Sequence, residues 1–437
     1  MDGRSPFKVE EPLHKVIFMI NEIKKYADEY SVNESYYDID EIRFSNNECD
    51  LNNVWSDHLY NIFAASGRRI VNIEIQNKND INNIEFLMKN AVENPSYNGI
   101  NNRHYSFEQK DMEMDDLEIY EIMKQMVDSA KLSGADSSAG LVYKKKFKNR
   151  VITNYNDIKY ITGGYEIVIR SFKDGFSGQE SVHTGFKFNI DPYRYGELAA
   201  ETARKTSKKI DIDEGKYDII LSPYALGTIM TYNSNFFSYY NIDAGISPFI
   251  DLLNSRVGPE NLTLNDEPLN MNGIGYRPVD DEGTLTSNKK IIDHGVLKTY
   301  LHSYSTSVKA GTATTGNAGI IHPVPWQLSI EPGSRSYIDI INDIDAGIFI
   351  NNSWYTRFQD QRAGIFSTVP RDGVFYIKHG EIVGSVSGIR ISDSIINILR
   401  NLQEVSSERV NVKWWDEIHP SIMPYALVNN INISKGF

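Results

Sequence analysis

Cysteine is almost absent from this sequence, which has a single one, Cys49, among 437 residues. One cysteine excludes an internal disulfide and any zinc site built on several thiolates. There are nine histidines, but none is followed by glutamate, so no H-E-x-x-H zinc helix can be written. The G-x-S-x-G pattern of serine hydrolases and the G-x-x-x-x-G-K-[ST] phosphate loop are also missing. The sequence therefore lacks the common short signatures of hydrolytic and nucleotide chemistry.

Positive charge and long apolar runs are also scarce. Lysine and arginine number 45 against 58 aspartates and glutamates, and the net charge of −13 disfavours nucleic acid as a partner. No run of 18 apolar residues occurs, so no membrane-spanning helix is predicted. Residues 14–30 carry charges throughout instead of the apolar core of a secretion signal. We expect a cytoplasmic protein that binds neither nucleic acid nor membrane.

One long segment lacks every strong acid, base and metal ligand. From Ser222 to Ile242 the chain has no Asp, Glu, His, Cys, Lys or Arg, although 24% of the whole sequence is charged. The segment follows a strand-like run and opens with Ser-Pro, a pair that favours a helix start. We predict a helix over 223–240 that cannot supply acid–base or metal chemistry.

The patterns along the chain predict an α+β protein of two domains. A length of 437 residues suggests two cores, and the polar stretch KKIDIDEGK at 208–216 is the best boundary. We predict a helix-and-sheet domain over 1–212 and a β-rich domain over 213–437. Apolar residues at helical spacing predict helices at 10–30, 80–93, 115–132, 193–208, 223–240 and 393–404. Strand-like runs in the first domain are 36–44, 58–66, 68–76, 138–147, 149–156, 158–172 and 175–185.

Two segments of the second domain share a hairpin pattern. KKIIDHGVLKTYL and VFYIKHGEIVGSV each place a His-Gly pair between two apolar runs. Histidine tolerates the left-handed backbone conformation better than most residues with a side chain. We therefore predict that His294 and His379 form turns and do not bind metal.

A short acidic element, RPVDDEGTLTSN, carries Asp280, Asp281 and Glu282 next to Gly283. Three neighbouring carboxyl groups could bind a cation or act as paired carboxylates in catalysis. They could equally accept hydrogen bonds from the backbone N–H groups of a turn, and we favour this structural role.

A second dense cluster lies in NNSWYTRFQDQRAGIFS. It contains Trp354, Tyr355, Arg357, Phe358, Asp360 and Arg362. Aromatic rings beside arginine are typical of interface hot spots, although a strand with a buried aromatic face would look similar. On a strand, Tyr355 and Arg357 would share one face while Trp354 points to the other. We predict that Trp354, Tyr355, Arg357 and Asp360 lie at a subunit interface or a peptide channel. Tyr355 and Arg357 would then share the surface that meets the partner or peptide, with Trp354 turned towards the core.

The order of motifs in the second half resembles the TldD/PmbA (TldD/TldE) family. That family has a D-D-E-G element, an I-x-x-G-x-L-x-x-Y-L hairpin and a T-G-N element. This chain has Asp280–Gly283, then Ile291–Leu301, then Thr315, Gly316 and Asn317. The segments EPGSRSYIDIINDIDAGIFI and GVFYIKHGEIVGSVSGIRIS are similar to later parts of the family pattern. The resemblance covers about residues 215–435, and it implies a β-rich second domain. We expect the residues of its D-D-E-G and T-G-N motifs to be structural.

The resemblance also gives a meaning to the uncharged helix. TldD-type members carry H-E-x-x-x-H at this place and a cysteine near the C-terminus, and these residues hold zinc for peptide hydrolysis. Here Thr231, Tyr232 and Phe236 fall near the positions of the two histidines and the glutamate, and the C-terminal segment has no cysteine. None of the three side chains can generate a zinc-bound hydroxide. The resemblance therefore implies a TldE/PmbA-like subunit with no catalytic residue, metal or cofactor of its own.

Such a subunit is expected to pair with a TldD-type zinc peptidase and to help enclose a channel for unfolded peptides. A homodimer is the other possible assembly. Two further interpretations stay open on the residues alone. The chain could be a hydrolase with a site unlike the family's, or a homodimeric peptide-binding protein without a protease partner.

Overall fold

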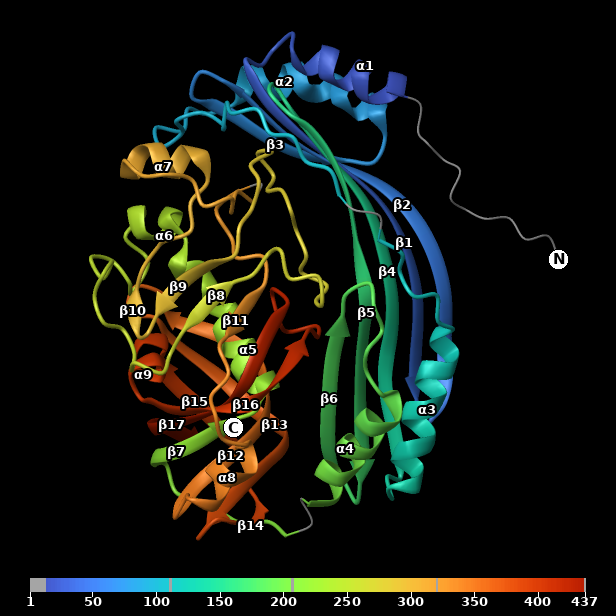
Figure 1. Ribbon diagram of the computed structural model, residues 1–437, viewed down its shortest axis with the longest axis vertical. Helices are drawn as coiled ribbons and strands as arrows, with labels where there is room; N and C mark the ends of the chain where they lie inside the picture. The colour runs from blue at the N-terminus through green and yellow to red at the C-terminus, as the bar shows by residue number, and fades with distance from the viewer. Residues whose placement is uncertain (1–12, 110–111, 206–207, 320, 436–437) are drawn as a thin grey trace, which may run out of the picture.

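A computed structural model describes residues 13–109, 112–205, 208–319 and 321–435 (Figure 1). The chain forms two separate sheets, one from β1–β6 and one from β7–β17, with helices packed around them. This arrangement confirms the predicted α+β class. The last strand of the first sheet ends at Thr184 and the first strand of the second begins at Gly215, within the polar stretch 208–216.

The first sheet is fully antiparallel, in the order β3-β2-β1-β4-β5-β6. Its strands are β1 (Glu29–Ser45), β2 (Glu48–Ser66), β3 (Arg69–Ile75), β4 (Ser137–Thr153), β5 (Asp157–Lys173) and β6 (Phe176–Thr184). Figure 1 shows the long strands as one curved sheet along the side of the C-terminal half. Apolar clusters join one end of the sheet to α1 (Leu13–Ile23), η1 (Lys78–Asn83) and α2 (Ile84–Asn90), and the other end to α3 (Ile119–Leu132) and α4 (Pro192–Lys205).

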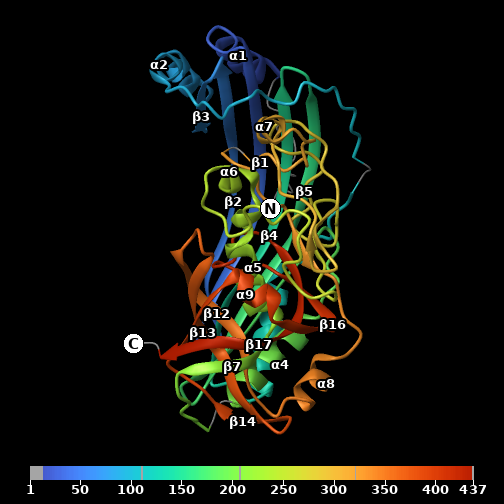
Figure 2. The same ribbon diagram turned by 90° about the vertical axis from the view of Figure 1, so that its left-hand side faces the viewer.

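The second sheet closes on itself. Strand β7 pairs with both β12 and β17, and the sequence β12-β13-β15-β17 completes a ring of five strands. Figure 2 shows β7 and β17 side by side. The strands are β7 (Gly215–Leu221), β8 (Leu264–Asp266), β9 (Lys289–Asp293), β10 (Val296–Leu297), β11 (Leu328–Ile330), β12 (Ala346–Asp360), β13 (Ile365–Lys378), β14 (Glu381–Ser385), β15 (Ile389–Ser394), β16 (Leu402–Val412) and β17 (Ser421–Lys435).

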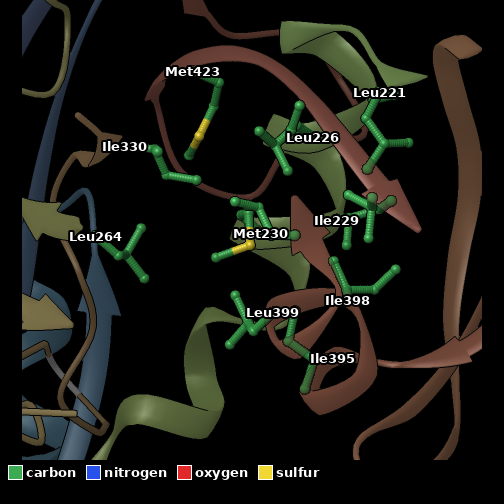
Figure 3. Close-up of a cluster of buried hydrophobic side chains, with 14 of the residues drawn as sticks. Leu221, Leu226, Ile229, Met230, Leu264, Ile330, Ile395, Ile398, Leu399 and Met423 are labelled. Carbon is green, nitrogen blue, oxygen red and sulfur yellow. The ribbon is translucent and has the colours of Figure 1, made fainter. Parts of the chain in front are cut away.

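One helix, α5 (Pro223–Tyr232), lies within the core that the second sheet surrounds. Its Leu226, Ile229 and Met230 pack with Met423 of β17 and with apolar residues of α9, as Figure 3 shows. The other helices are η2 (Ser234–Phe237), α6 (Tyr239–Asp243), α7 (Tyr304–Ala310), α8 (Tyr337–Asn342) and α9 (Ile395–Arg400). Within the part of the chain that the structure describes, no helix is long and apolar enough to span a membrane.

The predicted helix at 223–240 is wrong as a single element. It divides into α5, η2 and α6, with the first break at Asn233. There the Asn233 side chain donates to the Ile229 carbonyl oxygen at 2.8 Å, a local bond that competes with helical continuation. The predicted helix at 393–404 is also too long, because Leu402 already belongs to β16.

The two His-Gly turns are confirmed. His294 has φ 46° and His379 has φ 49°, each followed by a glycine with positive φ. Both histidines connect paired strands, β9 to β10 and β13 to β14. These residues therefore shape the backbone.

Candidate functional site

The local sequence sets where helix α5 begins, and the absence of charged side chains allows the helix to be buried. Ser222 caps the helix by accepting hydrogen bonds from the backbone N–H groups of Tyr224 and Ala225, and Pro223 occupies the first turn. Every residue from Pro223 to Thr231 is buried. A lysine or glutamate on this helix would have to be buried with its charge, which is costly without a partner.

The residues at the expected zinc positions do not fit a zinc ion. Thr231 is fully buried, and its hydroxyl oxygen has no hydrogen-bond partner in the described structure. Tyr232 and Phe236 both pack on Phe358 of β12, with ring centroids 4.6 and 4.9 Å away. Across the described residues, no group of three or more His, Cys, Asp and Glu side chains is arranged to hold a metal ion. The helix thus has hydroxyl and aromatic groups where a zinc helix needs imidazole and carboxylate ligands.

The tryptophan and tyrosine of the second cluster lie at a bulge in β12. The register with β13 shifts between Trp354 and Arg357, and Tyr355 has φ 57°. Thr356 is fully buried while Tyr355 is 44% exposed and Arg357 is exposed, so the in–out alternation persists. Trp354 is only partly buried, unlike the predicted core residue, and its ring lies 5.9 Å from that of Tyr355. Asp360 accepts a hydrogen bond from the Ala363 N–H in the turn that follows.

Sequence reasoning missed the loop that completes this cluster. Trp415 is 57% exposed, and its ring lies 5.4 Å from Trp354 and 5.9 Å from Tyr355. The guanidinium of Arg371 stacks over both Trp354 and Tyr355, at 5.4 and 5.6 Å. We call Trp354, Tyr355, Trp415 and Arg371 the aromatic–arginine surface. The adjacent tryptophans at 414 and 415, two of only five in the chain, were the signal that could have found it.

Trp414 links this surface to helix α5. Its side chain is fully buried and its indole N–H donates to the Thr228 hydroxyl at 3.0 Å. Its ring lies 5.5 Å from that of Trp354. The structure therefore brings together the two candidate regions that the sequence left separate, the uncharged helix and the β12 cluster.

The outer edge of β12 beside this surface has no second strand. Strand β7 pairs with β12 only at Ile348–Ile350, whereas β13 pairs with it as far as Asp360. Among the described strands, none covers the other edge of residues 352–360. Asp416, in the loop after β16, accepts a hydrogen bond from the Tyr355 N–H at 2.8 Å, so this edge is partly covered at the bulge. The part of the edge without a second strand, beyond Thr356, can pair with an extended chain.

The acidic element forms a buried turn centred on Asp280. Its carboxylate accepts hydrogen bonds from the backbone N–H groups of Glu282, Thr284 and Ala318, at 3.0, 2.8 and 3.1 Å. Burial raises the pKa of Asp280 to about 7. Asp281 forms an ion pair with Arg277, and Gly283 has φ 76°, a conformation that favours glycine.

The T-G-N residues support the same turn from a neighbouring loop. Thr315 accepts a hydrogen bond from the His302 N–H at 2.7 Å, and Asn317 donates to Asp266 at 2.7 Å. Gly316 has φ 68°, and a side chain there would meet the Leu285 carbonyl oxygen at 2.8 Å. These contacts give all three residues a role in holding loops together.

A cleft opens where the two halves of the chain meet. The first sheet and the loop after α2 supply one wall, and α6, α7 and the acidic turn supply the other. Figure 1 places α6 and α7 near the β3 end of the first sheet. Lys309 connects the two walls, because its ammonium group donates hydrogen bonds to Ser96 in the loop after α2 and to Asp243 of α6. Sequence reasoning did not foresee this cleft, because its residues range from Ser31 to Pro323.

Another buried carboxyl group lies between the halves. Glu180 of β6 is 7% exposed and accepts a hydrogen bond from the Tyr224 hydroxyl of α5 at 2.5 Å. Burial raises the pKa of Glu180 from 4.5 to about 7, against the lowering effect of the Tyr224 hydrogen bond. The protonated form of Glu180 is therefore favoured in the folded protein below about pH 7.

We expect Glu180 to weaken the fold as pH rises. Between about pH 4.5 and 7 the folded state keeps a proton on Glu180 that the unfolded state releases, so stability falls through this window. A Glu180→Gln variant cannot lose that proton. The free energy of unfolding of the variant, minus that of the unmodified protein, should therefore rise by about 3 kcal/mol between pH 4.5 and pH 7.5. Urea unfolding at a series of pH values measures this, with the exposed Glu381→Gln as control. If the difference in free energy of unfolding between Glu180→Gln and the unmodified protein does not change with pH, Glu180 does not have a raised pKa in the folded protein.

Comparison with known proteins places this geometry in context. The family model for the PmbA/TldA metallopeptidase C-terminal domain matches residues 214–435. A metalloprotease of Methanocaldococcus jannaschii is 29% identical over 233 residues, 51% of each chain. Metalloprotease PmbA of Escherichia coli O157:H7 is 26% identical over 161 residues, 36% of this chain and 34% of that one. The matched part thus spans about half the length of these curated relatives or less.

The fold matches over a longer span than the sequence. The crystal structure of TldE from Thermococcus kodakarensis has a TM-score of 0.82, with 19% identity, and the match covers 96% of this chain and 100% of that chain. At this identity the likeness concerns the fold alone. It includes both the curved first sheet and the closed second sheet.

Proposed function

This chain belongs to the TldD/PmbA metallopeptidase family, and on that premise we propose that it is a zinc-free, TldE/PmbA-like subunit of a cytoplasmic peptidase complex. In this proposal a TldD-type partner holds the zinc and cleaves the peptide bond. The present chain helps to enclose a channel for unfolded peptides. This chain forms part of the channel wall and supplies side chains that bind the peptide.

The composition of α5 is the observation that carries this proposal. By the resemblance, the helix stands where TldD-type members carry their zinc helix, and here it is buried, uncharged and built into the core of the closed sheet. Thr231 and Phe236 are buried, Tyr232 and Phe236 pack on Phe358, and none of the three side chains is an imidazole, thiolate or carboxylate. The fold of a zinc peptidase is thus combined with side chains that cannot bind zinc at that helix.

The edge of β12 supports the role in peptide binding. Residues 357–360 have no second strand on this side among the described strands, and the aromatic–arginine surface lies beside them. An extended peptide could add to this edge as a further strand, with backbone hydrogen bonds giving affinity for any sequence. Aromatic rings next to arginine would supply contact area at the same place. Binding without strong sequence preference suits unfolded peptides as substrates.

Purification from the native host tests the assembly and the metal together. The isolated chain should contain no stoichiometric zinc, and the native complex should contain a second family member with H-E-x-x-x-H that accounts for the zinc and the proteolysis. An isolated chain with one tightly held zinc, or one that cleaves peptides alone, would favour an independent hydrolase instead. A pure homodimer without protease activity in the host would favour a peptide-binding protein.

We expect Arg357→Ala to weaken partner assembly or partner-dependent cleavage by roughly 1–3 kcal/mol, the usual range for losing a hydrogen bond to a charged group. The reason is that Arg357 is exposed on β12, next to the free edge. Arg68→Ala, an exposed arginine on the β2–β3 turn, is the matched control. Complex affinity and cleavage rate are the measurements. If the two variants have the same complex affinity and the same cleavage rate, Arg357 does not lie at the interface.

A further inference from the structure

The cleft between the two halves has a wall of hydrogen-bond acceptors. Asn33 of β1 is 9% exposed and its side-chain N–H group donates to the Asp281 carbonyl oxygen at 3.1 Å. The side-chain oxygen of the same residue has no partner in the described structure. Because Asn33 lines the cleft, this buried acceptor is suited to a ligand that brings an N–H donor.

The charges of the cleft leave one carboxylate without a cation. Asp281 is paired with Arg277, and Asp243 with Lys309. Glu282 instead accepts only the Tyr304 backbone N–H, at 2.9 Å, and has no ion pair with any described residue. Burial, and then repulsion from Asp280, Asp281 and nearby Glu29, raise the pKa of Glu282 well above its ordinary value. A cation bound beside Glu282 would stabilise its charged form, so binding would lower this pKa and favour loss of the proton from Glu282.

The remaining lining suits an organic cation. Phe63, Tyr97, Tyr239 and Tyr240 place aromatic rings around the cleft, and rings of this kind attract ammonium groups. The described residues contain no group of three metal-type ligands here, which disfavours a divalent metal. An ammonium group can donate three hydrogen bonds at once, which matches an amide oxygen and a carboxylate together.

We propose that this cleft binds the ammonium group of an extended peptide, with Glu282 and the Asn33 side-chain oxygen as its acceptors. The inference rests on the proposed role in peptide binding and adds a chemical preference to it. The ammonium could come from a free amino terminus or from a lysine side chain. The two sources share the chemistry and differ in where along the peptide the group lies.

Binding of three peptides to the full chain tests the proposal. The first is a short, unstructured, lysine-free peptide with a free amino terminus, the second its acetylated form, and the third the acetylated form with one lysine. Calorimetry should show that acetylation weakens binding at least about tenfold, as expected when a charged hydrogen-bonded group is lost. Recovery of affinity with the lysine peptide would assign the site to side chains as well, and no recovery would assign it to the terminus. Equal binding of the first two peptides would overturn the proposal.

Glu282→Gln separates the site from the fold. Glutamine keeps an oxygen for the Tyr304 N–H, so the turn should stay intact, while the charge that attracts an ammonium is removed. We expect the free-amine peptide to bind this variant at least about tenfold more weakly, with the acetylated peptide unaffected. Relief of carboxylate repulsion should also leave the variant at least as thermally stable as the unmodified chain. Glu381→Gln, exposed on β14, should change neither binding nor stability.

The result is distinguishable from failure of the proposed function. If Glu282→Gln binds the free-amine peptide normally, the ammonium site is wrong even where a zinc-bearing partner is found and cleaves peptides. Titration with calcium or magnesium chloride alone should produce no binding heat at the cleft. Binding of either metal that Glu282→Gln abolishes would replace the ammonium site by a metal site and overturn the proposal.

Discussion

Replacing Trp414 with alanine is expected to lower the free energy of unfolding by roughly 3–5 kcal/mol, the usual cost of deleting a buried tryptophan. The ring is fully buried, packs against Trp354 and donates its N–H to Thr228 of α5. Alanine would leave a cavity and would also leave the Thr228 hydroxyl without this partner. The cluster around Trp414 includes Tyr224 of α5, Val412 of β16 and Val168 of β5, so the cavity would lie where the two halves of the chain pack together. Chemical unfolding of the C-terminal half, followed by circular dichroism, gives the value.

Trp415→Ala is the natural comparison, since the two tryptophans are neighbours with opposite exposure. Trp415 is 57% exposed, and its ring lies on the outer side of the aromatic cluster, 5.4 Å from the ring of Trp414. We expect its loss to cost well under half as much, while weakening any binding at the aromatic–arginine surface. Similar destabilisation by both substitutions would show that the loop does not anchor α5 through Trp414.

Asp280→Ala should destabilise the protein by at least about 3 kcal/mol. The substitution leaves three buried backbone N–H groups without an acceptor, and each such group costs about 1–3 kcal/mol. Part of this loss is offset, because a buried carboxylate with a pKa raised to about 7 is itself costly near neutral pH. Hydrogen exchange followed by mass spectrometry should report faster exchange at Glu282, Thr284 and Ala318.

Asp280→Asn keeps one side-chain oxygen and serves as the intermediate case. It should retain protection at some of the three amides and lose roughly half as much stability as the alanine variant. The alanine variant decides between the two roles considered for the acidic element. Unchanged exchange and stability, together with lost peptide cleavage in the complex, would point to a chemical role for Asp280 in place of turn capping.

Local features of this protein could be predicted from sequence because they depend on near neighbours. The His-Gly turns follow from a backbone preference, and the absence of ligands on α5 is visible in the letters themselves. The α+β class followed from alternating runs and helical spacing. Element ends were less predictable, as at Asn233, where one side-chain bond ends a helix.

The closed sheet and the cleft could not be predicted, because they join residues far apart in the chain. Leu221 lies opposite Ala426 in the β7–β17 pair, and no local pattern encodes that register. Asn33 meets Asp281 across the cleft in the same way. The roles of Trp414 and Trp415 differ for a similar reason, since only contact with Thr228 decides which ring is buried.

The position of β17 in the closed sheet has a consequence for biosynthesis. This strand pairs with β7, β11, β15 and β16, so the ring cannot form until residues 421–435 have left the ribosome. The first sheet is complete by Thr184 and can fold while translation continues. During the intervening synthesis, the apolar side chains of α5 have no closed sheet around them and are open to chaperones and to aggregation. The same helix that carries no charged residue thus makes the nascent chain dependent on rapid completion of its last strand.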